Sequence, residues 1–234
     1  LVLAREALYK FSVDRRKLFR HPFQPPLQEA FYRSMAEDYK GNLWIGSHYK
    51  GLIRLNLTDG ATRIFKNELE APGFPGSSIG CWHVLEDRLH QIWVRHSKGY
   101  SVYRPTRDTF YHIFPFGTDA KAHIERFAED RVGRVWIVAP ENGLGIADPQ
   151  YPELGLKQWV SQGNFLKSNN PSGVLADLSS RIWVGSTKGL ECLNPDLNTS
   201  TFYPLAYGIG GPVESMALLS SGEIVLGHRT SVSI

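Results

Sequence analysis

Short runs of alternating apolar and polar residues, separated by turns rich in glycine, aspartate and asparagine, make up most of this chain. In residues 37–55, EDYKGNLWIGSHYKGLIRL, one run surrounds Leu43 and Ile45 and a second surrounds Leu52 and Leu55, and a turn with glycine precedes each. A period of two residues is typical of β-strands, and helical periodicity is absent nearly everywhere. The pattern therefore predicts an all-β protein of short strands.

The same stretch recurs in frame along the chain. Four copies, at 37–55, 86–103, 129–147 and 176–193, each place an aspartate six residues before a tryptophan: Asp38 and Trp44, Asp87 and Trp93, Asp130 and Trp136, Asp177 and Trp183. A weaker copy at 218–234 has Leu219 and Val225 in these places, and the first residues align with Leu1 in the tryptophan place and Leu8 in the place of Leu52. The chain is a repeat protein.

The spacing of the repeat predicts the architecture. The residues in the tryptophan place of each copy, at 1, 44, 93, 136, 183 and 225, are 43, 49, 43, 47 and 42 residues apart. This is the period of a four-stranded propeller blade. We expect a β-propeller of four-stranded antiparallel blades in which residues 1–234 form a single propeller fragment. Because both ends supply the same repeat positions, we expect an open partial propeller: a partial blade of outer strands at 1–21, four full blades at about 30–212, and a partial blade of inner strands at 213–234.

The repeated aspartates and tryptophans are interpreted as structural. An aspartate at the start of a turn accepts hydrogen bonds from backbone amides two or three residues on, and glycine, as at Gly41 and Gly133, allows a positive φ at its end; His90 and Ser180 depart from this glycine. A buried tryptophan removes about 150–250 Å² from water. We therefore expect the four indoles to pack between blades.

An up-and-down order of strands assigns the loops to two faces. The turns between second and third strands share one face with the long connections between blades, and irregular loops on one rim of a rigid scaffold are the usual place for binding. These segments are the turns 47–51, 95–99, 139–143 and 185–189, and the connections near 66–80, 115–123, 161–172 and 204–212.

The candidate ligand-binding residues lie on this rim and at the adjoining ends of the inner strands. The turns supply His48, Tyr49, Lys50, Arg95, His96, Lys98 and Lys188, with His228 and Arg229 at the equivalent place and only Glu141 opposing them. The inner strands supply a row of Arg33, Trp82, Glu125, Ser172 and Glu214, followed one residue later by Ser34, His83, Arg126, Gly173 and Ser215. The turns are interpreted either as an electropositive mouth for an acidic oligosaccharide or as a solvated turn surface. The inner-strand rows suit a sugar and suit a channel closed by salt bridges equally well.

Composition narrows the classes of partner. The net charge of +3 comes without a basic run, which argues against nucleic acid, and no apolar stretch of 18 residues is present to span a membrane. Cys81 and Cys192 fall in different repeats and are interpreted as free thiols. No cofactor is predicted. The chain begins and ends inside strand patterns, so we expect a piece of a longer protein.

The run Asp-x-x-Gly-x-Leu-Trp-Ile-Gly-Ser…Gly-Leu at 38–52 resembles the two-component regulator propeller repeat. This resemblance implies the periplasmic sensor region of a bacterial hybrid histidine kinase or a related diguanylate cyclase receptor, in which a propeller precedes a further β-domain, one membrane span and a cytoplasmic output. It implies no catalytic residue, so this region is expected not to be an enzyme. A small-molecule or oligosaccharide ligand and the remainder of the receptor are the expected partners, and a second copy of the chain, forming a homodimer, is a further candidate.

Two other classes of function compete with the sensor. Some bacterial propellers with tryptophan-containing repeats are metal-assisted lyases, and His48, His96 and His228 lie in equivalent rim turns. No carboxylate lies in those turns to complete a set of ligands, so no metal site is assigned. A protein-interaction platform is the third class, because all propellers present such rims.

Overall fold

The computed structural model describes residues 1–3, 8–22, 31–65, 80–117, 124–161, 166–168, 170–194, 196 and 199–234. The chain divides into two compact units, residues 1–112 and 113–234, and each is described by itself. Much of the predicted connections near 66–80, 115–123 and 161–172 lies outside the described residues.

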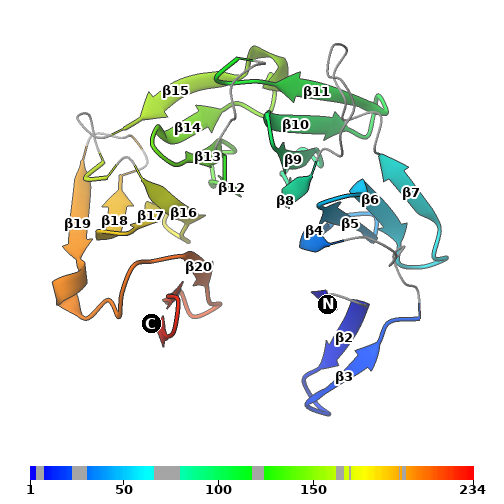
Figure 1. Ribbon diagram of the computed structural model, residues 1–234, viewed down its shortest axis with the longest axis horizontal. Coiled ribbons are helices and arrows are strands. Elements are labelled where there is room, and N and C mark those ends of the chain that lie inside the picture. The colour runs from blue at the N-terminus through cyan, green and yellow to red at the C-terminus, as the bar shows by residue number, and fades with distance from the viewer. Residues whose placement is uncertain are drawn as a thin grey trace. The chain divides into compact units, whose positions relative to one another are not determined.

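The first unit contains an N-terminal sheet of three strands and two blades of four strands (Figure 1). The N-terminal sheet consists of β1 (Val2–Leu3), β2 (Leu8–Ser12) and β3 (Lys17–Arg20). The first blade consists of β4 (Tyr32–Glu37), β5 (Asn42–Ser47), β6 (Gly51–Asn56) and β7 (Thr62–Phe65). The second blade consists of β8 (Cys81–Glu86), β9 (Ile92–His96), β10 (Gly99–Arg104) and β11 (Thr109–Ile113), whose last residue belongs to the second unit.

The second unit contains two blades of four strands and a C-terminal sheet of three. The third blade consists of β12 (Arg126–Glu129), β13 (Val135–Ala139), β14 (Gly143–Ala147) and β15 (Leu156–Val160). The fourth blade consists of β16 (Pro171–Ala176), β17 (Ile182–Ser186), β18 (Gly189–Leu193) and β19 (Ser200–Pro204). The C-terminal sheet consists of β20 (Ser215–Leu218), β21 (Ile224–Gly227) and β22 (Val232–Ser233).

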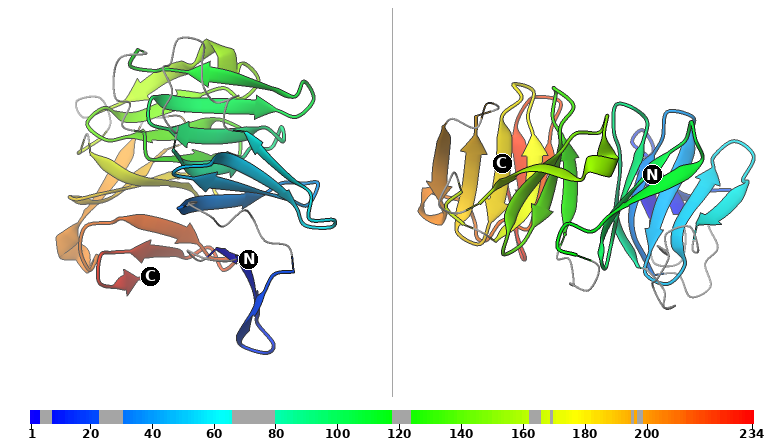
Figure 2. Two further views of the ribbon diagram at one scale, coloured as in Figure 1. Left: turned by 45° about the vertical axis from the view of Figure 1, so that its right-hand side comes forward. Right: turned by 90° about the horizontal axis from the view of Figure 1, so that it is seen from above.

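Every sheet is an antiparallel meander whose neighbouring strands are consecutive in the chain. The only helices in the described residues are two 3₁₀ turns, Pro152–Leu154 and Leu205–Tyr207. Within each sheet the strands run between two sets of turns (Figure 2). These observations confirm the predicted all-β fold of four-stranded antiparallel propeller blades. The predicted division into full and partial blades of one open propeller stays a prediction.

A repeated contact, which we call the Asp–Trp clasp, joins the first turn of each full blade to its second strand. One carboxylate oxygen of the aspartate accepts the indole N–H six residues on, at 2.7 Å for Trp44 and Trp93, 2.8 Å for Trp136 and 2.9 Å for Trp183. The other oxygen accepts the backbone N–H groups two and four residues on, at 2.8–3.1 Å. The aspartates therefore serve the turn, through amides two and four residues on rather than two and three, and they also hold the indole.

A fourth donor completes each clasp. The residue four places after the aspartate turns its side chain back to the carboxylate, through Asn42 Nδ2, Gln91 Nε2, Arg134 Nε or Arg181 Nε, at 2.7–3.0 Å. Burial raises the pKa of Asp87. Burial acts in the same direction on Asp38 and Asp177, but the hydrogen bonds outweigh it and lower the pKa of both carboxyls. Because a buried carboxylate is costly unless it is fully hydrogen-bonded, these donors are what allow it inside.

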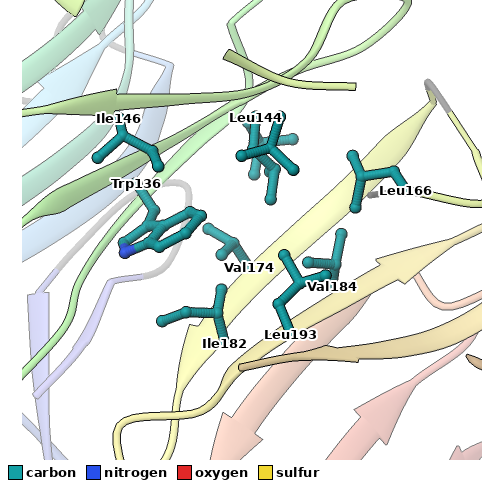
Figure 3. Close-up of a cluster of buried hydrophobic side chains, with 10 residues drawn as sticks. Trp136, Leu144, Ile146, Leu166, Val174, Ile182, Val184 and Leu193 are labelled. Atoms are coloured by element: carbon teal, nitrogen blue, oxygen red, sulfur yellow. The ribbon is translucent and has the colours of Figure 1, made fainter. Parts of the chain in front are cut away.

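Tryptophan and leucine side chains of one blade pack against the inner strands of the next. In the second unit Trp136 and Leu144 of the third blade meet Val174, Ile182 and Val184 of the fourth (Figure 3). In the first unit Trp44, Leu52 and Phe65 meet the second blade in the same way. Trp44, Trp93 and Trp136 are at most 1% exposed, whereas Trp183 is only partly buried beside the C-terminal sheet.

Two of the four clasp turns carry a strained residue where the repeat has glycine. His90 and Ser180 take φ values of +61° and +63°, close to the +75° of Gly41. This left-handed region costs a residue with a Cβ about 1–2 kcal/mol. His90 stacks on Tyr39 of the preceding blade, with ring centroids 3.8 Å apart, while the backbone N–H groups of Ser179 and Arg181, on either side of Ser180, are held by Asp177.

One predicted rim residue, His96, is inside the second blade instead. It is 1% exposed, and its Nε2 lies 3.0 Å from Ser101 Oγ, which in turn lies 2.9 Å from His112 Nδ1. Burial, with His112 adding to it, lowers the pKa of His96 to about 3. The turn after β9 is one residue shorter than the turn after β5, so His96 pairs with Gly99 as Ser47 pairs with Gly51. The assignment of His96 to the ligand-binding rim was wrong.

The clasp is tested by Trp136→Phe, which keeps an aromatic ring in the site and removes the N–H donor to Asp130 together with one ring of the indole. We expect a loss of about 1–3 kcal/mol in the free energy of unfolding, because a buried carboxylate then lacks one donor, and a loss of about 3–5 kcal/mol for Trp136→Ala. Urea unfolding measures both. The control repeats Trp136→Phe in an Asp130→Asn background, where the change should cost less because the carboxylate that accepts the indole N–H is already gone. If Trp136→Phe costs the same free energy of unfolding in both backgrounds, the clasp is contradicted.

The strain is tested by Ser180→Gly, which should raise the free energy of unfolding by about 0.5–1 kcal/mol because the residue is left-handed. Ser179→Gly, in the same turn at an ordinary φ, should give no gain. Thermal or urea unfolding of the two variants compares them directly, and an equal effect of both changes would show that φ is not the cause.

The buried histidine predicts how stability depends on pH. The unfolded chain protonates His96 near the ordinary pKa of 6.5, whereas the folded protein keeps it neutral down to about 3. The contribution of His96 to the free energy of unfolding is therefore fully present above pH 6.5. It falls as the pH drops from 6.5 towards 3, and about 1–2 kcal/mol is lost on reaching pH 5.

Urea unfolding at a series of pH values measures this slope. His96→Gln should flatten it, while the same change at the exposed His90 controls for the loss of one histidine. A slope that persists in His96→Gln would assign the dependence to other groups.

Candidate functional site

The innermost strand of each four-stranded blade, and of the C-terminal sheet, begins with a β-bulge. The ladder shifts register between Tyr32 and Ser34, between Cys81 and His83, and between Pro171 and Gly173. In the third blade the N–H of Glu125 bonds to the carbonyl of Val138, which Arg126 already faces, and in the C-terminal sheet Glu214 and Ser215 share Gly227 in the same way. The extra residue is therefore Arg33, Trp82, Glu125, Ser172 or Glu214, the row picked out in the sequence.

These bulges matter for binding because the extra residue leaves the pleat and its side chain is re-aimed. The bulge lies beside the turn between second and third strands, since Tyr32 pairs with Ser47 and Cys81 with His96. The inner-strand row and the rim turns therefore meet at one end of each sheet.

The bulge residue Trp82 is the centre of a cluster in the first unit, which we call the rim platform: Phe31, His48, Tyr49, Trp82 and Arg95. The indole N–H of Trp82 donates to Nδ1 of His48 at 3.1 Å. Because an indole can only donate, His48 accepts through Nδ1, and its ring proton lies on Nε2. The guanidinium of Arg95 lies over the Trp82 ring, 4.6 Å from its centroid.

Arg95 stands where the first and fourth blades have glycine. A Cβ at Gly46 would come within 2.7 Å of the Cys81 carbonyl, and one at Gly185 within 2.6 Å of Val213. In the first blade the start of β8 therefore occupies this space, and in the fourth blade Val213, two residues before β20, occupies it. In the second blade a long cationic side chain takes the position and stacks on the bulge residue, and His83 replaces the small Ser34 opposite it.

Two further aromatic rings extend the rim platform. Tyr49 meets His48 edge to face at 4.5 Å and meets Phe31 in the same manner at 5.6 Å, and the Phe31 carbonyl accepts the N–H of His48 at 2.8 Å. Tyr49 is 44% exposed and Phe31 is 39% exposed. Sequence reasoning missed Phe31, although it is an aromatic residue two positions before the bulge residue Arg33.

The structure thus brings together four of the predicted site residues, His48, Tyr49, Trp82 and Arg95. Other predicted residues of the same unit lie along the same end of the sheets: Arg33 is an exposed bulge residue, His83 follows Trp82 in β8, and Lys50 and Lys98 lie in the rim turns. A stacked guanidinium beside aromatic faces and nearby cations can bind a flat polar solute and donate two parallel hydrogen bonds to a carboxylate.

The other predicted residues belong to the second unit and are described within it. Arg126 is exposed in β12, and Lys188 is exposed in a rim turn, where its Nζ donates to the Lys167 carbonyl at 3.2 Å. His228 lies 3.1 Å from the Pro212 carbonyl and 2.6 Å from Ser233 Oγ.

The three histidines of the lyase hypothesis therefore have other roles. His48 is bonded to Trp82, His96 is buried, and His228 is bonded within its own sheet. In the part of the chain that the structure describes, no three His, Cys, Asp or Glu side chains gather as metal ligands. The described residues also contain no helix long and apolar enough to cross a membrane. Cys81 and Cys192 are not joined in a disulfide.

Similar solved structures have the same fold. The extracellular domain of a protein described as the hybrid two component system BT3049 from B. thetaiotaomicron is 17% identical, with a TM-score of 0.73 over 96% of this chain and 30% of that one. The corresponding domain of BT4673 is 22% identical, with a TM-score of 0.68 over 86% of this chain and 28% of that one. The chain thus spans less than a third of the length of these extracellular domains.

A virginiamycin B lyase from Staphylococcus aureus is also similar, at 13% identity and a TM-score of 0.65 over 83% of this chain and 62% of that one. No curated protein matches the sequence. Residues 26–49, which include the first clasp and part of the rim platform, match the family described as the two component regulator propeller. The resemblance of this chain to the two-component regulator propeller repeat is therefore confirmed.

Proposed function

We propose that this chain is the ligand-sensing propeller region of an extracytoplasmic receptor of the two-component type, and that its rim platform binds an oligosaccharide carrying carboxylate groups. The observation that carries the proposal is the stack of Arg95 on Trp82, with Trp82 bonded to His48.

The chemistry of the rim platform supports a sugar. Pyranose rings present C–H groups that pack on aromatic faces, and Trp82, Tyr49 and Phe31 are each partly exposed to solvent. Arg95 adds a planar fork of donors that suits a carboxylate, and its guanidinium is already oriented by the ring beneath it. A uronate unit would satisfy both parts of the rim platform at once.

The local charge supports an acidic solute. Arg33, Lys50 and Lys98 lie at the same end of the first two blades as Arg95. Such a group of like charges raises the local concentration of anions and speeds their encounter.

The comparisons support the place of this region in a receptor. The matching repeat and the extracellular domains of similar fold come from two-component systems. We propose a periplasmic location as part of an inner-membrane receptor, with the rest of that receptor as partner and the enzymatic step, histidine kinase or diguanylate cyclase, outside this region.

Calorimetric titration of this protein with acidic and neutral oligosaccharides of equal length tests the proposal. We expect tighter binding of the acidic set, weakened by salt because the attraction is between exposed charges. Arg95→Gln should weaken binding of the acidic set roughly 10- to 100-fold, the value of a charge-assisted hydrogen bond, and Lys50→Glu with Lys98→Glu should weaken it and reduce its salt dependence.

Arg107→Glu is the matched control, since it removes a cation from an exposed outer turn away from the rim turns. It should leave binding unchanged. Equal binding of acidic and neutral sugars with no effect of salt would reject the acidic ligand, and binding that survives Arg95→Gln and Trp82→Leu would reject the rim platform as its site.

A further inference from the structure

The hydrogen bond between His48 and Trp82 fixes the position of the indole on the rim platform. Nδ1 of His48, in the turn after β5, accepts the indole N–H at 3.1 Å. The guanidinium of Arg95 lies over the face of the same ring. Gly80 leaves room for the ring, since a Cβ there would come within 2.8 Å of it. The indole therefore has one defined place between the first and second blades.

This bond requires a neutral His48. An indole nitrogen carries a hydrogen and can only donate, whereas a protonated imidazole carries N–H groups at both ring nitrogens. Protonation of His48 would set two donors against each other at Nδ1, so the bond to Trp82 would break. Histidine is the side chain that ordinarily changes charge between pH 5 and 8. The rim platform thus contains a hydrogen bond that a proton can break.

The imidazole is particular to the rim turn of the first blade. Counted from the strand pairing, the equivalent places in the other rim turns hold Ser97, Pro140 and Thr187. None of these side chains changes charge with pH. The turn of the first blade is closed without the imidazole, because Ser47 Oγ accepts the backbone N–H of Lys50 at 2.9 Å. The His48 ring instead reaches the neighbouring blade.

We infer that His48 is a positioning residue for ligand binding: its neutral ring holds Trp82 in place beneath Arg95, and its protonation releases Trp82. The inference rests on the proposed function in one respect, since it takes the rim platform as the binding site. It also predicts the sign of a pH effect. Added positive charge on the rim would strengthen the binding of an acidic sugar, whereas release of Trp82 weakens it.

Other ionisable groups lie on the elements beside His48. They are Tyr49 and Lys50 in its own turn, Tyr32 and Arg33 in β4, Cys81 and His83 in β8, and Arg95 in β9. Burial raises the pKa of Tyr32 to about 12 and holds the pKa of the Cys81 thiol well above its usual range. His83 carries the other imidazole of this group, so the experiment has to separate it from His48.

The indole N–H signal of Trp82 in a nitrogen-15 NMR spectrum of the ligand-free protein reports the bond, and Trp82→Phe identifies this signal. We expect it to shift between pH 8 and pH 5 as the bond is lost. His48→Asn places an amide oxygen near Nδ1 and cannot be protonated, so it should keep the bonded signal at both pH values. His48→Phe keeps a ring beside Tyr49 without an acceptor and should show the released signal at both.

Calorimetric titration with tetragalacturonate at the same two pH values measures the consequence for binding. We expect binding to weaken by about 3- to 10-fold from pH 8 to pH 5, the value of one hydrogen bond. His48→Asn should remove this loss, and His83→Asn should keep it. His90→Asn is the matched control, because it makes the same change at an exposed histidine in a clasp turn; both readouts should stay as in the original protein.

The two readouts fail separately. A Trp82 signal that is the same at both pH values, or that shifts equally in His48→Asn, overturns the inference whatever the protein binds. Binding that tightens at pH 5, to the same extent in the original protein and in His48→Asn, overturns it as well. No binding of tetragalacturonate at either pH, with the expected Trp82 signals, would reject the proposed ligand and support the hold of His48 on Trp82.

Discussion

The hydrogen bond from an indole N–H to a buried aspartate is the interaction on which the rest of each blade depends. It ties the turn between the first two strands to a side chain that also fills the space between blades, so turn geometry and inter-blade packing are set together. In the C-terminal sheet the three side chains of the clasp are absent together. Leu219, Glu223 and Val225 stand in place of the aspartate, the fourth donor and the tryptophan. An unmatched carboxylate or indole would be costly when buried, so the parts are kept or lost as a set.

The clasp and the rim platform lie at opposite ends of the strands, and their polar side chains face different surroundings. At the clasp the carboxylate accepts hydrogen bonds from within its own blade, and it is buried in the second, third and fourth blades and partly buried in the first. At the rim the bulge re-aims a side chain outward, and in the second blade two positions that are small in the first blade carry Arg95 and His83. The first arrangement gives rigidity, and the second presents polar and aromatic groups on that rigid support.

Much of the fold could be predicted because the physical cause of each element is local. The aspartate, glycine and tryptophan recur in frame, and each is tied to a short-range requirement: an amide-accepting turn, a positive φ, a buried ring. The fourth donor could also have been found, since Asn42, Gln91, Arg134 and Arg181 share one place in the repeat and all carry N–H groups. It was missed because three different residue types, Asn, Gln and Arg, share this one function.

The candidate site was harder to predict, because the rim turns differ in length by one residue. Aligning the rim turns on their final glycine put His96 beside His48, whereas counting from the tryptophan puts it beside Ser47, a buried strand end. The stacking of Arg95 on Trp82 depends on a bulge that shifts the register of β8, and an alternating pattern does not show such a shift. Side chains that meet across a bulge are fixed by tertiary packing rather than by spacing.

The bulge also bears on how such a chain can change over time. Its extra residue is Arg33, Trp82, Glu125, Ser172 or Glu214, which are four residue types of different size and charge on the same kind of shifted ladder. The backbone at this place accepts any of them, because the residue lies outside the pleat and packs in no blade core. A substitution there alters what a sheet presents without touching its clasp, so recognition can diversify one blade at a time while the cost to folding stays small.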